Sequence, residues 1–371
     1  MQKGVKKMAR KKPNYVSSTK VMSMKGRYNF VIGAWSNGKS YAVKGGVVKE
    51  CWKKGKKLAY IRRLMKEDSD TNAENYFLDC PVEQITDGEY TAIVCYRRVL
   101  YFANYDKEKA KYIRGRELGR RFNLYEAYQT KSMVFQDYAF GIFEEVITLD
   151  NYLPQESYRL QRLVSTISRT GNIKVYMIAN TITPICPYYR EWQLVNIPKM
   201  EFDQIDTYEI DSTVEEGKTE SVKVQVYLTH PLDAHSNMII GALAKEAHGG
   251  AFHCEEHNHL DCSINDCSIK YRMVICYEGQ KMLMQFVRDK FGNYVWFVSP
   301  KTSEIQKGTR TIGQLRSNSM LHTNKLTPIS DRERKAFDYL LSGKIAYSDN
   351  LTGTLFLQML KGIGVEGFQY E

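Results

Sequence analysis

Short apolar runs separated by polar and basic segments are the main pattern of the first two hundred residues. Most of these runs are rich in aromatic and β-branched residues, as expected for buried strands. The expected strands lie at 27–32, 58–63, 91–96, 99–103, 138–143 and 172–178. Helices are expected at 39–54 and at 155–168, where Tyr158, Leu160, Leu163 and Ile167 are expected to face inward. Strands that alternate with helices predict an α/β unit built on a mostly parallel, covered sheet.

The pattern changes after residue 200, where the chain becomes acidic and mixed before a short helix expected at 236–247. Three strand-like runs separated by turn residues then predict an antiparallel meander, at 268–277, 281–288 and 294–298. Two further helices are expected near 330–342 and 351–361. The predicted organisation is a basic flexible arm (1–24), an α/β domain (25–200), a partly helical linker region (201–257) and a smaller α+β domain (258–371).

A complete phosphate-binding motif, G-x-x-x-x-G-K-S, follows the first expected strand and precedes the first long helix. It comprises Gly33, Ala34, Trp35, Ser36, Asn37, Gly38, Lys39 and Ser40. The two glycines permit backbone angles and close approaches that a side chain would block, and the loop amides then face the phosphates. Lys39 is expected to reach the β- and γ-phosphates, and Ser40 to ligate Mg²⁺. The motif therefore predicts ATP and Mg²⁺ as cofactors; the alternative is a glycine-rich turn with an incidental Lys-Ser pair.

Acidic and amide side chains end the later strands of this unit. Glu144 and Glu145 close the apolar run at 138–143. In a nucleotide hydrolase, one such carboxylate holds Mg²⁺ through water and the next activates the attacking water. We expect Glu144 on the metal side, Glu145 as the general base, and Asn180, at the end of the next strand, beside the γ-phosphate. The alternative is that these residues only cap their strands.

Arg169 lies at the end of the helix between these two strands. An arginine in this position can reach a neighbouring subunit's nucleotide and stabilise charge in the transition state. Arg159, Arg162 and Lys131 are alternatives for this role. A solvated arginine favoured by the helix dipole is the simpler interpretation.

The net charge of +11 is unevenly distributed along the chain. Residues 1–131 hold 29 Lys and Arg against 13 Asp and Glu, a balance of +16, whereas the rest of the chain sums to −5. This asymmetry favours a polyanion partner, and contacts to phosphates would hold double-stranded DNA without reading its sequence. A solvated basic face that serves solubility is the alternative. The candidate DNA-binding residues are Arg62, Arg63, Lys66, Arg97, Arg98, Arg114, Arg116, Arg120 and Arg121.

Hydropathy and cysteine usage narrow the function classes further. No stretch of about 18 apolar residues occurs, so no membrane partner is expected. The basic N-terminus is not followed by the apolar segment that a secretory signal needs, and eight cysteines in such a chain favour reduced thiols in a cytosolic setting. Histidines and cysteines crowd residues 253–267 in a spacing that matches no zinc pattern, so a polar loop is favoured over a metal site.

Together these motifs resemble the genome-packaging ATPases of φ29-like tailed phages. The resemblance covers about 25–200 and rests on 29–42, 60–63, 131–132, 142–145, Arg169, Asn180 and 187–189. One departure is Glu144, because the family has Asp at that position. Beyond residue 235 the resemblance is one of layout alone.

The resemblance implies a P-loop NTPase of the ASCE type whose ATP hydrolysis drives double-stranded DNA into a preformed capsid. It also implies a homomeric ring, pentameric, on the phage portal. In such a ring Arg169 would act in trans as the arginine finger and Lys131 would lie near the subunit interface. A structural packaging RNA is a further partner that the resemblance raises. The motor would work in the host cytoplasm, attached transiently to the procapsid.

The meander followed by helices in 258–371 is compatible with the ribonuclease-H-like nuclease that large viral packaging motors often carry. Such a nuclease needs clustered carboxylates for two metal ions, with one on the first strand. Residues 268–277 contain no carboxylate. We therefore predict a nuclease-like domain without nuclease activity, which binds the portal, DNA or RNA instead.

Three other functions stay open at the level of sequence. A different nucleic-acid motor, of helicase or partition type, would share the phosphate loop and the basic half. A small-molecule kinase would transfer phosphate to a metabolite and ignore DNA. A nucleic-acid-binding protein with a purely structural nucleotide site would bind ATP without hydrolysing it.

Overall fold

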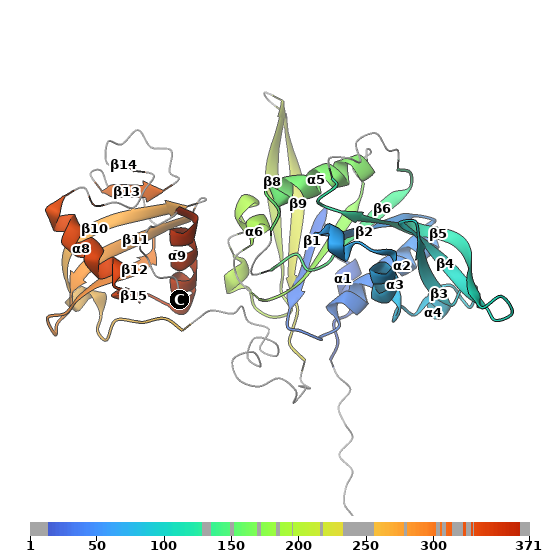
Figure 1. The fold of residues 1–371 in the computed structure, drawn as a ribbon, viewed down its shortest axis with the longest axis horizontal. Helices are drawn as coiled ribbons and strands as arrows, with labels where there is room; N and C mark the ends of the chain where they lie inside the picture. Colours follow the sequence, from blue (N-terminus) through green and yellow to red (C-terminus); the bar gives the residue numbers. More distant parts are fainter. Residues whose placement is uncertain are drawn as a thin grey trace, which may run out of the picture. The chain divides into compact units, whose positions relative to one another are not determined.

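The computed structural model describes residues 14–127, 135–148, 152–168, 172–182, 186–194, 196–215, 218–232, 256–277, 280–301, 305, 309–313, 322–323, 328 and 330–363. The chain divides into two compact units, residues 1–253 and 254–371 (Figure 1). The helix predicted at 236–247 lies outside the described residues. Among the described helices, none is long and apolar enough to cross a membrane.

A nine-stranded sheet forms the centre of the first unit, in the order β3-β4-β5-β2-β6-β7-β1-β9-β8 (Figure 1). Its strands are β1 (Tyr28–Gly33), β2 (Lys57–Arg62), β3 (Ala92–Tyr96), β4 (Val99–Asp106), β5 (Lys111–Asn123), β6 (Tyr138–Phe143), β7 (Lys174–Asn180), β8 (Ile205–Glu215) and β9 (Lys218–Leu228). The helices are α1 (Ser18–Met22), α2 (Lys39–Lys54), α3 (Asp70–Phe77), α4 (Val82–Ile85), α5 (Glu156–Ile167) and α6 (Pro187–Glu191), with 3₁₀ turns at Met65–Glu67 and Ile197–Lys199. The strands and helices predicted between 25 and 200 all begin within two residues of their predicted starts.

The six neighbouring strands from β5 to β9 in this order run parallel. Antiparallel pairs extend the sheet at both edges, through β3 and β4 on one side and β8 on the other. The predicted mostly parallel sheet is therefore confirmed. Strand β7 lies between β1, which leads into the phosphate loop, and β6, which ends just before Glu144. The carboxyl ends of these three strands consequently meet at one edge of the sheet.

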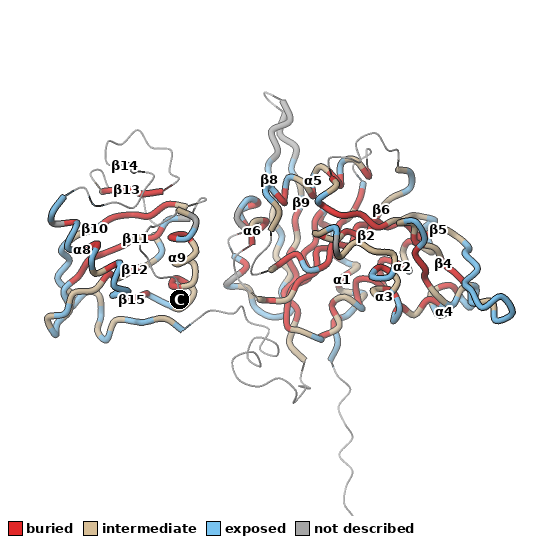
Figure 2. Tube along the Cα trace, viewed as in Figure 1, coloured by how far each residue is buried: buried red, intermediate tan, exposed pale blue. Residues whose placement is uncertain are grey.

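Apolar side chains cover both faces of the sheet. Phe30 and Ile32 of β1 join the cluster that contains Leu160 of α5, whereas Val31 joins the cluster that contains Val47 of α2. This alternation follows from the two-residue period of a strand. Figure 2 shows the central strands buried along most of their length, and all six residues of β1 are buried. The phosphate loop thus starts from the rigid centre of the unit.

The prediction that 201–257 is a linker region is wrong for its first part, because β8 and β9 belong to the main sheet. Strand β9 pairs in parallel with β1, and β8 pairs with β9. Val224, Val226 and Leu228 are buried; Lys223 is exposed and Gln225 half-buried at the alternate positions, and only Tyr227 among these is buried, against the other face of the sheet. This alternation is typical of a strand with one exposed face, and it makes the average composition look like that of a linker.

The predicted flexible arm is also wrong from residue 14 onward. Ser17 caps α1, and Val16 and Val21 are buried. The Val16 amide donates to the carbonyl of Asn37 in the phosphate loop at 3.0 Å. Because α1 packs on α2, the segment before β1 is a strap beside the loop.

A six-stranded sheet forms the second unit, in the order β14-β13-β10-β11-β12-β15. Its elements are β10 (Ser268–Tyr277), β11 (Gln280–Arg288), β12 (Tyr294–Pro300), β13 (Arg310–Gly313), β14 (His322–Thr323), β15 (Ile345–Tyr347), α8 (Asp331–Leu341), α9 (Asn350–Ile363) and a 3₁₀ turn at Ile264–Asp266. The antiparallel meander β10-β11-β12 is confirmed, and β13 runs parallel to β10. Trp296 and Phe356, both fully buried, anchor the core between sheet and helices.

Candidate nucleotide-binding site

The phosphate loop joins β1 to α2, and its backbone conformation requires glycine at two positions. Gly33 has a φ of +154°, and a Cβ on it would lie 2.0 Å from Oγ1 of Thr229. Gly38 has a φ of +88° and precedes the first turn of α2. Ser36 also has a positive φ, of 56°. The loop therefore needs glycine at the two positions where the motif has it.

Lys39 lies inside the loop and is 5% exposed. Its ammonium donates to the carbonyl of Gly33 at 3.1 Å, to the carbonyl of Ala34, and to Oδ1 of Asn37 at 3.2 Å. It also donates to Oδ1 of Asn180 at 3.0 Å, so the predicted γ-phosphate neighbour contacts the predicted phosphate-binding lysine. Burial lowers the pKa of Lys39 to about 7, and the charge of Glu144 opposes this shift.

Thr229 and His230, just after β9, contact the phosphate loop. The sequence did not predict these two contacts. The Thr229 amide donates to the carbonyl of Ile32 at 2.8 Å, and Thr229 Oγ1 accepts from Nδ2 of Asn37 at 2.7 Å. Asn37 Nδ2 also donates to the carbonyl of His230 at 3.0 Å. The alternation of apolar and polar residues before Thr229 could have indicated a strand. The acidic and mixed composition of the segment concealed that alternation.

A cavity of about 380 Å³ opens above the loop and gathers most of the predicted site residues. It is lined by Ser36, Asn37, Gly38, Lys39, Ser40, Tyr41, Glu144, Glu145, Ile147, Ile178, Ala179, Asn180 and Ile182. Gly33, Ala34 and Trp35 form the back of the loop, outside this lining. Residues from three separate parts of the sequence thus meet at the carboxyl edge of the sheet.

Glu144 is buried at this edge, with 8% of its surface exposed. Burial raises the pKa of its carboxyl, an effect that the hydroxyls of Tyr76 and Ser40 oppose. Among the described residues, Oε1 of Glu144 has no geometrically acceptable hydrogen-bond donor. A buried carboxylate oxygen without a donor, beside the Ser40 hydroxyl, fits the oxygen ligands that Mg²⁺ prefers.

Glu145 differs from its neighbour in both backbone and surroundings. Its φ is 57°, and its side chain is 64% exposed. Oε2 of Glu145 accepts from the guanidinium of Arg62 at 3.0 Å, and Arg62 also pairs with Glu67 at 3.4 Å. The predicted base therefore lines the cavity while an ion pair holds its carboxylate.

Several arginines predicted to contact DNA are bound inside the unit instead. Arg63 and Arg121 are buried; Arg63 pairs with Glu156 at 2.8 Å, and Arg121 pairs with Asp70 at 2.8 Å. The prediction of a DNA contact is wrong for these two, since a buried guanidinium cannot reach DNA. Arg62 is engaged by Glu145. Arg116 donates to the last carbonyls of α2 and lies over Trp52. Sequence alone could not show these partners because they come from distant segments.

The turn between β3 and β4 carries basic residues that are better placed for an anionic partner. Arg97 and Arg98 both have positive φ, and their amides donate to the carboxylate of Asp70 at 3.0 and 3.1 Å. Arg97 and Arg114 are exposed and lie over the ring of Tyr96. Arg98 pairs with Glu126, and Arg120 is half-buried. Arg169, Lys131 and the side chain of Lys66 lie outside the described residues.

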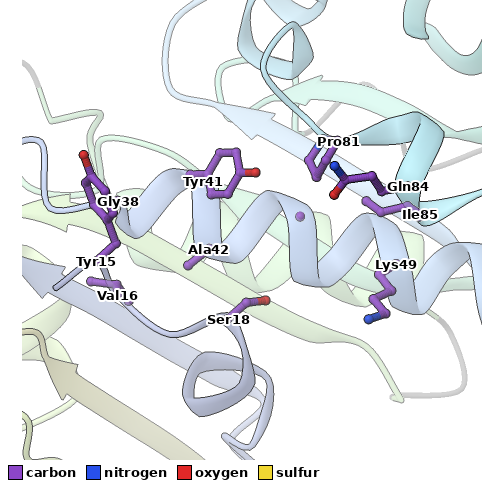
Figure 3. A pocket seen from close by; sticks show the side chains of 11 residues that line it. Tyr15, Val16, Ser18, Gly38, Tyr41, Ala42, Lys49, Pro81, Gln84 and Ile85 are labelled. Atoms are coloured by element: carbon purple, nitrogen blue, oxygen red, sulfur yellow. The ribbon is translucent and has the colours of Figure 1, made fainter. Parts of the chain in front are cut away.

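A second pocket, of about 680 Å³, borders the loop along the outer face of α2 (Figure 3). Tyr15 and Tyr41 flank it next to Gly38, and both rings are about half exposed. Pro81, Gln84 and Ile85 line it from α4. The sequence analysis assigned no role to Tyr15, because it placed that residue in the flexible arm.

In the second unit, a buried ion pair lies between β13 and α8. Arg310 donates to Oε2 of Glu333 at 2.5 Å, and the hydroxyl of Tyr271 on β10 donates to Oε1 of Glu333. In the part of the chain that the structure describes, no three His, Cys, Asp or Glu side chains gather as metal ligands would. A carboxylate bound to an arginine is not placed to hold a catalytic metal ion.

The described part of the histidine- and cysteine-rich segment packs on α9. His257 contacts Thr354, and His259 contacts the Tyr347 carbonyl and Asn350. The Sγ atoms of Cys262 and Cys267 are 3.6 Å apart. His253 and Cys254 lie outside the described residues. The polar-loop interpretation of this segment stays a prediction.

Comparison with known proteins identifies the family of the chain. Residues 10–216, more than half of it, match the family described as Podovirus DNA encapsidation protein (Gp16). The chain belongs to this family. Among curated relatives of this Gp16-family chain are the DNA packaging proteins of Bacillus phages phi29 and PZA, each 27% identical over 196 residues, which cover 52% of this chain and 54% of theirs. The DNA packaging protein of Bacillus phage B103 is 31% identical over 174 residues, 45% of this chain and 48% of that relative.

The chain spans about half the length of the curated relatives that it matches. Among solved structures, the Gp16-family chain is similar to the bacteriophage Phi-29 viral genome packaging motor assembly, with a TM-score of 0.62 and 17% identity over 94% of this chain and 99% of that one. It is also similar to the Phi-28 gp11 DNA packaging motor, with a TM-score of 0.50 and 14% identity over 96% and 99%. At these identities the likeness establishes a shared fold.

Proposed function

We propose that the chain is an ATP-driven motor that translocates double-stranded viral DNA into a preformed procapsid. The observation that carries the proposal is the cavity where Lys39, Ser40, Glu144, Glu145 and Asn180 converge above the phosphate loop. Membership of the DNA encapsidation family supports packaging over the helicase, partition and small-molecule kinase alternatives. The strand order, with β7 between β1 and β6, supports the ASCE type of P-loop ATPase.

The polar and charged groups named above each have a proposed role in hydrolysis. The loop amides and Lys39 bind the β- and γ-phosphates. Ser40 and Glu144 would hold Mg²⁺, which neutralises charge on the phosphates when it is bound. Glu145 acts as the general base for the attacking water once its carboxylate leaves Arg62, and Asn180 lies beside the γ-phosphate. Arg169 supplies the arginine finger in trans, with Lys131 near the same interface.

The apolar pocket beside the loop suits the nucleobase of ATP. A base bound there would stack on Tyr41 or Tyr15 while its phosphates lie on the loop, because both rings flank the pocket next to Gly38. Pockets of this kind combine apolar walls with a few polar groups that fix orientation.

The remaining assignments concern assembly. The subunits form a pentameric ring on the phage portal. In each subunit, exposed basic residues such as Arg97 and Arg114 contact the DNA phosphates. The motor acts in the host cytoplasm while attached to the procapsid, where a structural packaging RNA is a further partner. Family membership supports this setting.

We propose that the second unit is a ribonuclease-H-like domain that has lost nuclease activity, and its sheet order supports this. A meander β10-β11-β12 is followed by β13 parallel to β10 and β14 parallel to β13. The buried pair of Arg310 with Glu333 lies beside β10, which has no carboxylate. We infer that this unit does not cleave nucleic acid and serves in binding.

The experiment that tests the motor is steady-state ATP hydrolysis with and without double-stranded DNA. DNA should stimulate turnover, and Glu145→Gln should lower it roughly 10²- to 10⁴-fold, the usual contribution of a general base. Glu67→Gln is the matched control, because it also removes a partner of Arg62 but leaves the base intact. Mixing Glu145→Gln with Arg169→Ala should restore activity if the finger acts in trans. A silent Glu145→Gln together with no effect of DNA would refute the motor.

A further inference from the structure

A pocket of about 540 Å³ lies within the second unit, between one face of its sheet and helix α8. It is lined by Lys270, Tyr271, Phe286, Tyr294, Asp331, Lys335 and Tyr339. The three lining residues from α8 are spaced four apart, so they form one stripe along the helix. The volume lies within the range of small-ligand sites, about 300–1,000 Å³. The hydrolysis scheme uses none of these residues.

Aromatic side chains form the floor and one wall of the pocket. The rings of Phe286 and Tyr294 are stacked, with centroids 5.6 Å apart and an angle of 21° between the planes. The Tyr339 ring lies against both, at centroid distances of 5.4 and 6.0 Å. Phe286 is buried, whereas the tyrosines of the lining are half-buried. Partly exposed rings that line a pocket are suited to stack with a flat ligand.

Basic side chains surround these rings. Lys270 and Lys335 belong to the lining, and both are exposed. The guanidinium of Arg288 lies 5.9 Å from the ring centroid of the β12 tyrosine, and the ammonium of Lys344 lies 5.0 Å from that of the α8 tyrosine. This positive charge beside stacked rings favours a ligand that combines a flat ring with an anionic group.

Two charged groups of the lining have exposed partners. Asp331, the acidic residue among the lining residues, pairs with Arg334 at 3.8 Å. The ammonium of Lys270 donates to Oγ of Ser268 at 2.8 Å. Contacts between exposed groups of this kind contribute little free energy, because water competes for them. An anion that approaches Lys270 and Lys335 therefore does not have to break a buried ion pair.

A nucleotide whose base is unpaired has this combination of features. Proteins that bind single-stranded nucleic acid stack its bases on aromatic side chains and contact its phosphates with basic groups. A duplex presents its phosphates and the edges of its bases, while the base faces are covered by their stacked neighbours. Double-stranded DNA, the substrate proposed for the motor, consequently cannot place a base face against these rings.

We propose that this pocket binds an unpaired nucleotide of a single-stranded nucleic acid: the base stacks against Tyr294 and Tyr339, and Lys270 and Lys335 contact the adjoining phosphates. This ligand rests on the binding role proposed for the second unit and does not involve the ATPase site. RNA and DNA share the chemistry, so the experiment includes both. The alternative interpretation is that the rings only complete the packing beneath α8.

The test measures binding of labelled single strands to the full chain by fluorescence anisotropy. The probes are an RNA and a DNA of the same sequence, about eight nucleotides long. Excess unlabelled double-stranded DNA is present throughout, because it occupies sites that bind the phosphates of any nucleic acid. Tyr294→Leu and Tyr339→Leu remove one ring each and keep an apolar side chain. The matched control is Tyr277→Leu, since Tyr277 is half-buried against the same core but lies outside the lining.

Each variant of the two pocket tyrosines should weaken single-strand binding about 5-fold or more, the usual effect of losing one base–aromatic stack. Tyr277→Leu should bind like the native chain. Tighter binding of the RNA strand would identify RNA as the source of the nucleotide, and equal binding would identify single strands of either kind. Thermal unfolding of each variant shows whether its core is intact.

Lys335→Gln keeps the test decisive if a tyrosine variant fails to fold, because it changes only an exposed side chain. It should lower the affinity and make the slope of log K against log salt concentration shallower by about 0.7, the value for one phosphate contact to a single strand. Lys281→Gln is the control, because Lys281 is exposed on β11 outside the lining.

Native single-strand binding by Tyr294→Leu, Tyr339→Leu and Lys335→Gln would overturn the pocket as the site and leave a binding role elsewhere in the second unit. Absence of single-strand binding by the native chain would overturn the ligand itself. Hydrolysis of ATP and its stimulation by double-stranded DNA should be native in all these variants, so the pocket and the motor fail separately.

Discussion

At the scale of single residues, the site combines charged groups with burial that changes their behaviour. Lys39 is enclosed by loop carbonyls and side-chain oxygens, which accept from its ammonium. Glu144 is buried without a full set of donors, while Glu145, one residue later, is held at the surface by Arg62. Adjacent carboxylates thus have different environments, which is how two similar groups acquire different roles.

The lowered pKa of Lys39 predicts proton uptake when nucleotide binds. With a pKa of about 7, Lys39 is mostly neutral at pH 8, and phosphates beside it would restore the charged form. Binding of a non-hydrolysable ATP analogue at pH 8 should therefore take up close to one proton, and at pH 6 close to none. Calorimetry in buffers with different ionisation enthalpies measures this number. Above pH 8 the affinity should fall by up to about tenfold per pH unit.

Uptake that is equal at both pH values, or net release at pH 8, would contradict this behaviour of Lys39. The same titration of Lys39→Gln measures the contribution of the nucleotide's own terminal phosphate, because this variant lacks the titrating ammonium.

At the scale of elements, the loop is held by strands that are far away in sequence. Strand β9 extends the parallel sheet next to β1 and brings Thr229 under the loop. Helix α3 holds the basic turn after β3, because Asp70 at its start accepts from the amides of Arg97 and Arg98. Elements distant in the sequence therefore hold both the phosphate loop and the basic turn in place.

Thr229→Val is expected to loosen the loop. The variant keeps the shape of the side chain but removes the acceptor of Asn37, so a buried amide loses one partner and unfolding should become easier by about 1–3 kcal/mol. Nucleotide affinity should fall with it. Urea unfolding and nucleotide titration measure the two effects. Thr207→Val on β8 is the control, because the hydrogen bond that its hydroxyl accepts from Gln225 is exposed. If Thr229→Val left nucleotide affinity unchanged, β9 would have no role in nucleotide binding.

At the scale of the whole molecule, charge is concentrated where the nucleotide site lies. The first 131 residues carry a net charge of +16. Several of their arginines, however, form ion pairs inside the unit or donate to carbonyls at the end of a helix. The exposed remainder includes Arg97 in the turn between β3 and β4 and Arg114 on β5, both over the ring of Tyr96. Net charge thus indicates the class of partner, whereas burial decides which charges are available to it.

Replacing Arg97 and Arg114 by glutamine should weaken binding of double-stranded DNA equally for all sequences. The slope of log K against log salt concentration should become shallower by about 0.9 for each DNA phosphate that the variant no longer neutralises. Fluorescence anisotropy at several salt concentrations measures it. Arg116→Gln removes one positive charge from β5, the strand that carries Arg114, at a side chain engaged with α2, so its slope should stay native. Equal slopes in the native chain and in all variants would exclude Arg97 and Arg114 from the DNA interface.

Prediction from sequence succeeded where local pattern and structure coincide. The motif from Gly33 to Ser40 requires a strand before it and a helix after it, and the strands ending at Glu144 and Asn180 were recognisable from their apolar runs. Prediction failed for β9, where one exposed face diluted the apolar signal, and for residues 14–22, whose basic neighbours suggested a flexible arm. It also failed for Arg63 and Arg121, since their partners Glu156 and Asp70 lie on other elements.

The sequence by itself determined the candidate chemistry of the site: which groups are expected to bind phosphate, which carboxylates follow a strand, and that the phosphate loop joins strand to helix. Only the tertiary structure decided which of those groups meet, how deeply each is buried, and which arginines remain exposed. The physical reason is that a motif depends on backbone geometry within a few residues, whereas burial and ion pairing depend on contacts between strands and helices distant in the chain.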